Sequence, residues 1–446
     1  MSAAFFDLEF DANDLWGEDG ALVGPSLVRA RGSGPKIFYR SRTGLLAEEV
    51  PFRTDLSLLQ AQMVAAHLGL ADALVRKNCA QNAILANVLY VHAQCAGNRV
   101  FYSRDRNFYA EIDSRYAPPF YTYSRMLEGV AELEAAGLIE SIKTSPSPVA
   151  KYRSRIRASD MLLGKTAEIG VDFSVSPREV IILKSVTGQL LPYDNSSDEI
   201  INRRRDVLEH NAFLESVDIR VVHPEAHYDE CGFLSIRDRR LDPRMRKYYR
   251  VFNGGWSSGG RWYGPYWQGL PKDIRKALRI NGDVIVEHDY RACHVRLLCA
   301  LGGITLPFDD PGFDPYEGVG YDRKQVKRAL NTMLNASSEA AALGAIQNEF
   351  ADQRIYPPGA HARAIMMAVR DHFTGLARFW CSGIGLRLQN FDAEICRCVQ
   401  RHLRRRNIPV LSVHDSFIVP SSHGGVLADV MEQEMRSQCQ KLSLRK

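Results

Sequence analysis

The sequence contains no run of about eighteen apolar residues, no CxxC pair and no Cys/His array with zinc-site spacing. The first absence excludes an ordinary membrane-spanning helix, and the others exclude the common structural zinc motifs. The Walker A pattern GxxxxGK[ST] is also missing, which excludes a built-in P-loop motor. Residues Met1–Asp19 are acidic and lack a long apolar stretch, so we expect no secretory signal.

What is present indicates a globular protein with more than one domain. The chain has 446 residues, of which 45% are hydrophobic and 24% charged, and one hydrophobic core seldom fills that length. Nine scattered cysteines without a disulfide framework favour reduced thiols and a cytoplasmic location. No membrane association is expected.

Basic residues are concentrated locally. The totals of 57 Lys+Arg and 52 Asp+Glu give a formal charge of only +5, which alone does not indicate nucleic acid. Arg237–Arg250, however, contains seven basic and two acidic residues, and Arg397–Arg406 contains five arginines and no acid. Such runs suit a phosphate backbone, although a solvated surface is their commoner meaning.

The N-terminal half divides into an arm and a domain. Residues 1–55 show little periodicity and are expected to form an extended arm, while helical spacing begins at Leu56 and continues, with a second helix from Ile84, to about Tyr90. A helix over 123–136, stopped by Gly137, precedes two short strands at 138–143 and 151–157. Residues 56–165 thus resemble a winged-helix module.

The module's charges leave its role open. The helix that would enter a DNA groove carries three acids against one base: Glu128, Glu132, Glu134 and Arg125. Phosphates repel such a face, so the strand pair is the better contact surface, with Lys151, Arg153, Arg155 and Arg157. A structural or protein-contact role is equally open.

Residues 166–280 are expected to connect the two halves. They include an apolar strand at 180–184, a long helix capped by Ser196 or Ser197, and a Gly- and aromatic-rich stretch, VFNGGWSSGGRWYGPYWQGLP. Three Trp and two Tyr among glycines next to arginines suit base stacking and backbone contact. The alternative is a compact aromatic turn.

Two aspartates lie at strand ends. VIVEHDY (284–290) predicts a strand ending on Asp289, followed by a helix, and PVLSVHDSFIVP predicts two strands that meet at His414 and Asp415. Two carboxylates brought together can bridge a pair of Mg²⁺ ions in phosphoryl transfer. Alone, either Asp is more often a turn residue.

A third segment lies between them. Asp322 can cap a helix, RKQVKRALNTMLNAS, in which Arg323, Lys327 and Asn331 recur every four residues. A triphosphate docked on this stripe would meet both cations. Taken alone, a segment with this pattern is more often an ordinary amphipathic helix with one solvated face.

In order, DYRACHVR (Asp289–Arg296), RKQVK with its helix (323–336) and VHDS (Val413–Ser416) resemble motifs A, B and C of the A-family polymerases, which include single-subunit phage RNA polymerases. The resemblance covers roughly residues 250–420. It implies an α+β fold: a right-hand polymerase with a palm sheet and helical fingers and thumb, preceded by the winged-helix-like domain. The expected domains are a thumb-like connector over 166–280 and a palm over 281–446, with fingers inserted at about 315–385.

The resemblance implies roles residue by residue. Asp289 and Asp415 would hold two Mg²⁺ ions, with Mn²⁺ as an alternative, helped by the backbone carbonyl of Tyr290. Lys327 would act at the α-phosphate and leaving pyrophosphate, and Arg323 at the outer phosphates. The primer-template contacts would come from His414 at the primer terminus and from Arg250, Arg261, Arg387, Gln389 and Asn390.

Several positions depart from the family pattern. His294 occupies the sugar-gate position, where Glu is usual, and the positions that receive the base and sugar hold Asn331 and Asn335. Ala336 replaces a Gly, and Ser416 ends motif C as in the RNA-synthesising branch. A His can exclude a 2′-hydroxyl by bulk or accept its hydrogen bond, so the sugar choice is not transferred.

We therefore expect a template-directed nucleotidyltransferase, a DNA polymerase that extends a primer 3′-OH, because Tyr follows the metal Asp. The alternatives are an RNA polymerase or primase activity on the same fold, and a catalytically inactive nucleic-acid-binding replication factor. Expected partners are a primer-template and nucleoside triphosphates, with replication proteins such as a helicase or primase.

Overall fold

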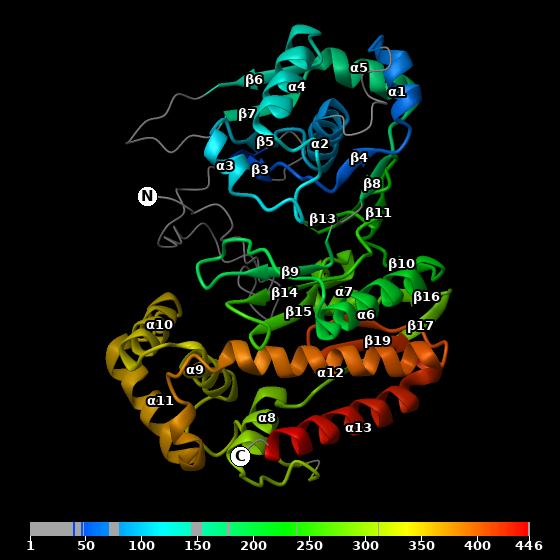
Figure 1. Ribbon diagram of the computed structural model, residues 1–446. Helices are drawn as coiled ribbons and strands as arrows, with labels where there is room; N and C mark the ends of the chain where they lie inside the picture. The colour runs from blue at the N-terminus through cyan, green and yellow to red at the C-terminus, as the bar shows by residue number, and fades with distance from the viewer. Residues whose placement is uncertain are drawn as a thin grey trace. The chain divides into compact units, whose positions relative to one another are not determined.

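The computed structural model describes residues 39–40, 46–47, 49–70, 80–143, 154–175, 179–237, 239–310 and 312–444. It is 48% helix and 18% strand, which confirms a mixed α+β composition. The chain divides into two compact units (Figure 1). Unit 1 comprises Met1–Ile201, Arg220–Tyr249 and Gly264–Leu278, and unit 2 comprises Asn202–Ile219, Arg250–Tyr263 and Arg279–Lys446. The expected connector, 166–280, contributes to both.

The front of unit 1 runs helix, strand, two helices and a strand pair. These are α2 (Ala80–Gln94), β5 (Arg99–Tyr102), α3 (Arg106–Ala110), α4 (Tyr123–Ala135), β6 (Ile139–Ile142) and β7 (Ser154–Ala158). β7 lies between β5 and β6 and is antiparallel to both, while β3 (Glu49–Pro51) joins β5 in parallel. The predicted helix, its stop at Gly137 (φ +69°) and the strand pair are confirmed. Lys151 and Arg153 lie outside the described residues.

The expected helix start at Leu56 is wrong. Leu56–Leu58 forms strand β4, antiparallel to β8 (Phe173–Val175), and α1 begins only at Ala61 (Ala61–Leu68). Leu56 and Leu58 are buried while the Ser between them is less so, which is the period-two pattern of a strand. Three residues are too few for periodicity to separate the two structures.

Helix α2 forms the centre of unit 1. Residues 83–91 are all buried, because this helix is apolar on every side. Its one amide in that stretch, Asn87, accepts a hydrogen bond from the backbone N–H of Arg53 (2.7 Å) and donates to the carbonyls of Arg53 (2.9 Å) and Ala83 (2.8 Å). Burial of this polar group is therefore compensated.

Unit 1 contains further short elements. Helix α5 (Asp160–Ile169) is capped by Ser159, whose Oγ accepts from the N–H of Leu162 at 3.1 Å. The remaining strands and turns are β1 (Tyr39–Arg40), β2 (Leu46–Ala47), β9 (Ile181–Lys184), β11 (His227–Tyr228), β12 (Leu234–Ile236), β13 (Arg239–Leu241), η2 (Tyr266–Gly269) and α7 (Lys272–Arg275).

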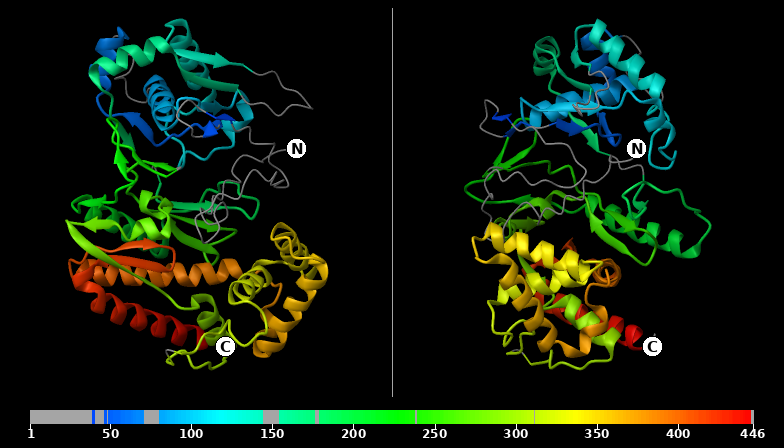
Figure 2. Two further views of the ribbon diagram at one scale, coloured as in Figure 1. Left: turned by 180° about the vertical axis from the view of Figure 1, so that it is seen from behind. Right: turned by 90° about the vertical axis from the view of Figure 1, so that its left-hand side faces the viewer.

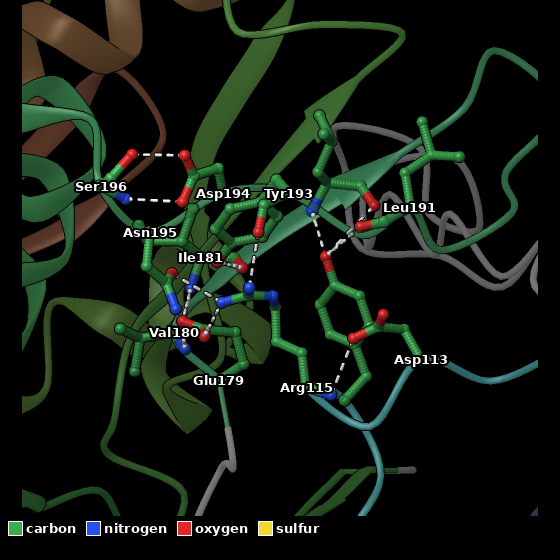
Figure 3. Close-up of polar contacts among 12 residues, drawn as sticks. Asp113, Arg115, Glu179, Val180, Ile181, Leu191, Tyr193, Asp194, Asn195 and Ser196 are labelled. Atoms are coloured by element: carbon green, nitrogen blue, oxygen red, sulfur yellow. Dashed lines mark hydrogen bonds and ion pairs between the residues drawn. The ribbon is translucent and has the colours of Figure 1, made fainter.

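Arg115 fixes the segment around β9, as Figure 3 shows. Its guanidinium lies 3.9 Å from the ring centroid of Tyr193, donates to Asn195 Oδ1 (2.7 Å) and lies 3.6 Å from the Glu179 carboxylate. The neighbouring Tyr116 hydroxyl donates to the Leu191 carbonyl at 2.9 Å. The loop that carries Arg115 and Tyr116 thus contacts the residues that precede β9 and those that follow it.

Unit 2 is built on an antiparallel sheet. The five-stranded order is β10-β16-β17-β19-β18, with β10 (Ile219–Val221), β16 (Leu278–Ile280), β17 (Asp283–Asp289), β19 (Ser416–Pro420) and β18 (Leu411–Val413), and the last three strands lie wholly in unit 2. In the β17–β19 pair Asp289 lies opposite Ser416, and in the β18–β19 hairpin Val413 lies opposite Ser416. The predicted strand and hairpin are confirmed.

Two long helices pack on this sheet. α12 (Gly385–Arg405) and α13 (Gly424–Ser443) run side by side in Figures 1 and 2. Gln400 of α12 donates to Ser412 Oγ of β18 at 2.9 Å. α8 (Cys293–Gly302) is joined to α13 by Arg296 and Glu432 at 3.0 Å. These helices hold the strand ends in place.

Unit 2 contains further helices and a strand pair. They are α6 (Asp198–Glu215), α9 (Arg323–Asn335), α10 (Glu339–Asp352), α11 (Pro358–His372), η3 (Thr374–Phe379) and η4 (Ser421–His423), with β14 (Tyr249–Asn253) and β15 (Gly259–Tyr263). Asp322 caps α9 as predicted, accepting from the N–H groups of Lys324 (2.9 Å) and Gln325 (3.3 Å).

We predict that unit 2 loses stability as the pH falls below about 6.5. His210 on α6 is fully buried against Trp262, and burial, helped by Arg404, lowers the pKa of His210 to about 3. An unfolded His binds its proton near pH 6.5, so acid favours the unfolded chain. The expected loss between pH 7 and pH 5 is about 2 kcal/mol, measured by urea denaturation.

His210→Gln should remove that pH dependence, whereas His227→Gln, at an exposed position, should retain it. If the free energy of unfolding changed with pH in the same way for the wild-type protein and for His210→Gln, the role assigned to His210 would be contradicted.

Candidate functional site

The sheet of unit 2 brings Asp289 and Asp415 together. Asp289 ends β17 opposite Ser416, the residue that follows Asp415, and the backbone N–H of Tyr290 donates to the Asp415 carbonyl at 3.4 Å. His414 has φ +57°, as the first position of a two-residue hairpin turn requires. The turn and the strand register therefore place both aspartates at the same end of the sheet.

The residues around the pair differ in exposure. Asp289 is exposed and Asp415 half-buried. Tyr290 is buried, and its hydroxyl donates to the Met431 carbonyl of α13 at 2.7 Å. Burial raises the pKa of the Tyr290 phenol well above its usual value. Its ring therefore anchors the strand end and leaves only the backbone near the aspartates.

The thiol of Cys293, on the first turn of α8, is affected by several nearby carboxylates. Burial raises the pKa of its thiol, and the negative charges of Asp415, Asp392 and Asp289 raise it further. Three aspartates from three elements thus act on one buried side chain. The sequence identified two of them, and Asp392 on α12 was missed.

Asp392 binds two side chains that the sequence did identify. Its Oδ2 accepts from Arg261 Nη2 at 2.7 Å and lies 2.9 Å from His294 Nε2. The Asp392 side chain is only 3% exposed, yet its pKa is lowered because Arg261 and His294 outweigh the cost of burial. The only sequence signal was an acid on the buried side of an amphipathic helix.

Ser416 interacts with a further acid on the neighbouring strand. Its hydroxyl donates to Glu287 Oε1 at 2.7 Å. Glu287 and Asp289 are two residues apart on β17 and therefore point to the same side of the sheet. Ser416 thus contacts an acid two residues before Asp289.

Helix α9 presents cations, as predicted, but one of them is paired. Arg323 lies 2.7 Å from Asp314 and over the ring of Tyr316, with its guanidinium 5.4 Å from the centroid. Burial raises the pKa of Tyr316, and the Asp415 charge adds to the effect, which puts Tyr316 in reach of the site. Lys327 is half-buried and has no ion pair among the described residues.

The two asparagines of α9 lie near its end. Asn335 donates through Nδ2 to the Asn331 carbonyl at 2.9 Å. Its side chain packs against Gly385 so closely that a Cβ there would overlap it. The helix end is also fixed by the N–H of Cys381, which donates to the Met333 carbonyl at 2.7 Å.

Two residues expected to contact nucleic acid are buried instead. Arg250 is 0% exposed and donates to Glu394 (2.8 Å) and to the Gly260 carbonyl (2.7 Å). Asn390 donates to the carbonyls of Trp256 (3.2 Å) and Gly259 (3.1 Å). Both are corrected to structural roles, because their side chains are buried and donate to acceptors inside unit 2.

The remaining expected contacts keep accessible surface. Arg387 is exposed and lies over the Phe391 ring, Gln389 is half-buried, and the half-buried His414 ring packs edge-on against Tyr263 at 6.0 Å. Arg261 is one-sixth exposed because Asp392 holds it.

The aromatic stretch is largely buried, and several arginines of the basic runs are paired with protein acceptors. Trp262 and Trp267 are buried, which favours the compact-turn alternative over a stacking surface. Arginines of the 237–250 run bind protein acceptors, chiefly acids: Arg237 with Asp273, Arg239 with the Gly269 carbonyl, Arg240 with Asp229, Arg244 with Asp242 and Asp172, and Arg250 with Glu394. In the second run, Arg397 and Arg404 bind Asp206 and Glu209 of α6.

The donor set of the site suits Mg²⁺ only in part. Within the described ranges, no group of three or more His, Cys, Asp or Glu side chains is arranged to hold a metal. Mg²⁺ commonly uses one or two carboxylates together with water and substrate phosphates. Asp289 and Asp415 fit that pattern, and a phosphate substrate would supply the remaining ligands.

No protein-family model matches the sequence, and the curated proteins contain no significant match. In the described part of the chain, no helix is long and apolar enough to cross a membrane.

We predict that Gly260→Ala destabilises the support of the site. Gly260, beside Arg261, has φ +86°, and a Cβ there would lie 2.6 Å from the Phe252 ring. Backbone strain and overpacking should together lower the free energy of unfolding by about 2–4 kcal/mol in urea denaturation.

Gly344→Ala is the matched control. Gly344 lies inside α10, and a Cβ there meets no atom within 4 Å. This change should raise the free energy of unfolding by about 0.5–1 kcal/mol. Equal effects of the two substitutions would contradict the role assigned to Gly260.

Proposed function

We propose that the protein is a template-directed nucleotidyltransferase, a DNA polymerase that extends a primer 3′-OH. The observation that carries this proposal is the pairing of β17 with β19, which brings Asp289 to the turn that holds Asp415. Two carboxylates held at adjoining strand ends can bind metal ions for phosphoryl transfer.

In the proposed reaction the 3′-oxygen attacks the α-phosphorus of a nucleoside triphosphate, and the bond to pyrophosphate breaks. Asp289, Asp415 and the Tyr290 backbone carbonyl would hold two Mg²⁺ ions, or Mn²⁺. When bound, these ions neutralise charge on the reacting phosphate. The proton of the attacking hydroxyl leaves to solvent, and the leaving pyrophosphate gains one.

Helix α9 supports a triphosphate site. Lys327 would donate the proton to pyrophosphate, and Arg323, held by Asp314, would bind the outer phosphates. Tyr316 lies beneath Arg323, and its pKa is raised by burial and, in smaller part, by the Asp415 charge, which supports a position of Arg323 near the aspartates. Asn331 and Asn335 lie one and two turns beyond Lys327 on the same helix and would face the nucleotide.

The front of unit 1 supports a nucleic-acid-binding role of a winged-helix type. Its element order and the position of β7 between β5 and β6 match what is expected of a winged helix, which supports this assignment. Arg157 on the strand pair is bound to Glu140 at 2.5 Å, which reduces its attraction for phosphates. We therefore assign the principal catalytic contacts to unit 2.

Primer extension tests the proposal. The wild-type protein with Mg²⁺ and a short DNA primer-template should add nucleotides that match the template, and Asp415→Asn should reduce the rate by at least about a thousandfold, because a metal ligand is lost. Deoxy- and ribonucleotides are supplied in separate reactions, so that RNA synthesis is distinguished from DNA synthesis. DNA binding without extension by the wild-type protein would instead support an inactive replication factor.

Lys327→Ala should lower kcat by about a hundredfold or more, because it removes a general acid. Lys324→Ala is the matched control, since Lys324 is exposed on the first turn of the same helix. Single-turnover incorporation measures both rates. Equal rates for the two variants would remove Lys327 from the chemistry.

A further inference from the structure

A surface pocket of unit 2 lies beside the end of α11. Its volume is about 380 Å³, and Arg370, Thr374, Ala377 and Trp380 line it. Sites for small molecules usually measure about 300–1,000 Å³. Thr374 and Ala377 are exposed, so the pocket opens to solvent. Its lining residues are distinct from those assigned to the nucleotide site.

A spacing of three or four residues puts these side chains on one face. Arg370 lies in the last turn of α11, Thr374 and Ala377 lie on η3, and Trp380 directly follows η3. A 3₁₀-helix has three residues per turn, so side chains at i and i+3 eclipse each other. Ala377, in the middle, carries only a methyl group, which leaves room between Thr374 and Trp380.

Arg370 supplies the positive charge of the pocket. Its Nη1 donates to Glu339 Oε1 of α10 at 2.9 Å. The two side chains are 33% and 65% exposed, so water competes with this pair. The hydrogen bond from Arg370 lowers the pKa of Glu339, whose carboxylate is therefore ionised at neutral pH. An oxyanion in the pocket would compete with Glu339 for a guanidinium that can fork onto two oxygens.

Trp380 supplies an aromatic wall. Its partly exposed ring packs edge-on against the buried Phe373, with the ring centroids 6.4 Å apart. Trp380 Nε1 is buried and has no hydrogen-bond partner among the described residues, although a buried indole N–H usually has one. Packing rather than a hydrogen bond therefore holds the ring, which can turn to meet a flat ligand.

The backbone next to this wall is fixed to α9. The N–H of Cys381, the residue after Trp380, donates to the Met333 carbonyl at 2.7 Å, and the N–H of Gly383 donates to the Ala336 carbonyl at 2.9 Å. The pocket thus combines an adjustable ring with a backbone held by hydrogen bonds.

We propose that this pocket binds a small anion that carries a flat ring, with the anionic group on Arg370 and the Thr374 hydroxyl and the ring against Trp380. Phosphate and carboxylate groups share the chemistry that a guanidinium and a hydroxyl recognise. A nucleoside monophosphate and an aromatic carboxylate are therefore the two sources to compare. This inference is independent of the nucleotidyl transfer proposed for Asp289 and Asp415.

Equilibrium dialysis with radiolabelled AMP and radiolabelled anthranilate tests the two sources. EDTA is present, so that metal ions at Asp289 and Asp415 do not contribute. At least one of the two compounds should bind with a Kd of about 1 mM or tighter. Its partial analogues should bind at least about tenfold more weakly, because adenosine and aniline lack the anion and inorganic phosphate and acetate lack the ring. Weaker binding of both compounds, or equal binding of a partial analogue, would overturn the inference.

Two substitutions should change the affinity in opposite directions. Arg370→Gln should weaken binding about tenfold or more, because the cation is lost, whereas Glu339→Gln should tighten it about threefold, because the competing carboxylate is lost. General damage to the fold would weaken binding in both variants. Weaker binding in Glu339→Gln would therefore overturn the inference.

Arg363→Gln is the matched control for bulk charge. Arg363 is exposed on α11, two turns before Arg370, and its loss should leave the Kd unchanged. Equal effects of the substitutions at Arg363 and Arg370 would show attraction by net charge alone and would overturn the site.

NMR locates the bound compound. The indole ¹⁵N–H signal of Trp380, assigned by its loss in Trp380→Phe, should shift as the compound is added, and an unchanged signal at saturation would overturn the inference. Asp415→Asn should bind the compound with the wild-type Kd, which separates this pocket from the aspartate pair. Neither readout uses nucleotidyl transfer, so a failure of primer extension would overturn the proposed function and leave this result standing.

Discussion

The antiparallel register of β17 and β19 determines the geometry of the whole candidate site. A shift by one residue would turn every side chain of a strand to the other face of the sheet. Asp289 would then point toward the side where Tyr290 now bonds α13, and the tyrosine anchor would be lost. The helices behind the sheet oppose such a shift, because Gln400 donates to Ser412 of β18 and the Met431 carbonyl accepts from Tyr290, which directly follows β17. Burial on one face therefore maintains the chemistry at the strand ends.

Internal ion pairs are the second constraint on unit 2. Helix α12 carries Asp392 and Glu394, and each pairs with an arginine from the β14–β15 hairpin. Arg250 is completely buried in this packing, whereas the Arg261 side chain remains partly exposed to solvent. Because the two acids are two residues apart, one turn of the helix orients both arginines. This arrangement explains how a hairpin rich in flexible glycines can hold a guanidinium next to the aspartates.

Local signals in the sequence predicted the local structure well. The Asp322 cap, the Gly137 stop and the strands that end at Asp289 and Asp415 were all recognisable, because each depends on neighbouring residues. The partners of Arg250 and Arg261 were not, since 144 and 131 residues separate them from Glu394 and Asp392. Composition alone does not distinguish a basic run that binds phosphate from one that binds the protein's own acids. The roles drawn from the polymerase resemblance remain predictions.

The neutralisation of the 237–250 run has a consequence for how any nucleic acid would be held. Binding driven by phosphate contacts gains free energy from the release of condensed counterions, in proportion to the number of cations that reach the backbone. An arginine already bonded to an aspartate contributes little to that release. The run of seven basic residues should therefore add far less to the salt dependence of binding than its charge suggests. Affinity at high ionic strength would depend more on shape and on hydrogen bonds than on bulk charge.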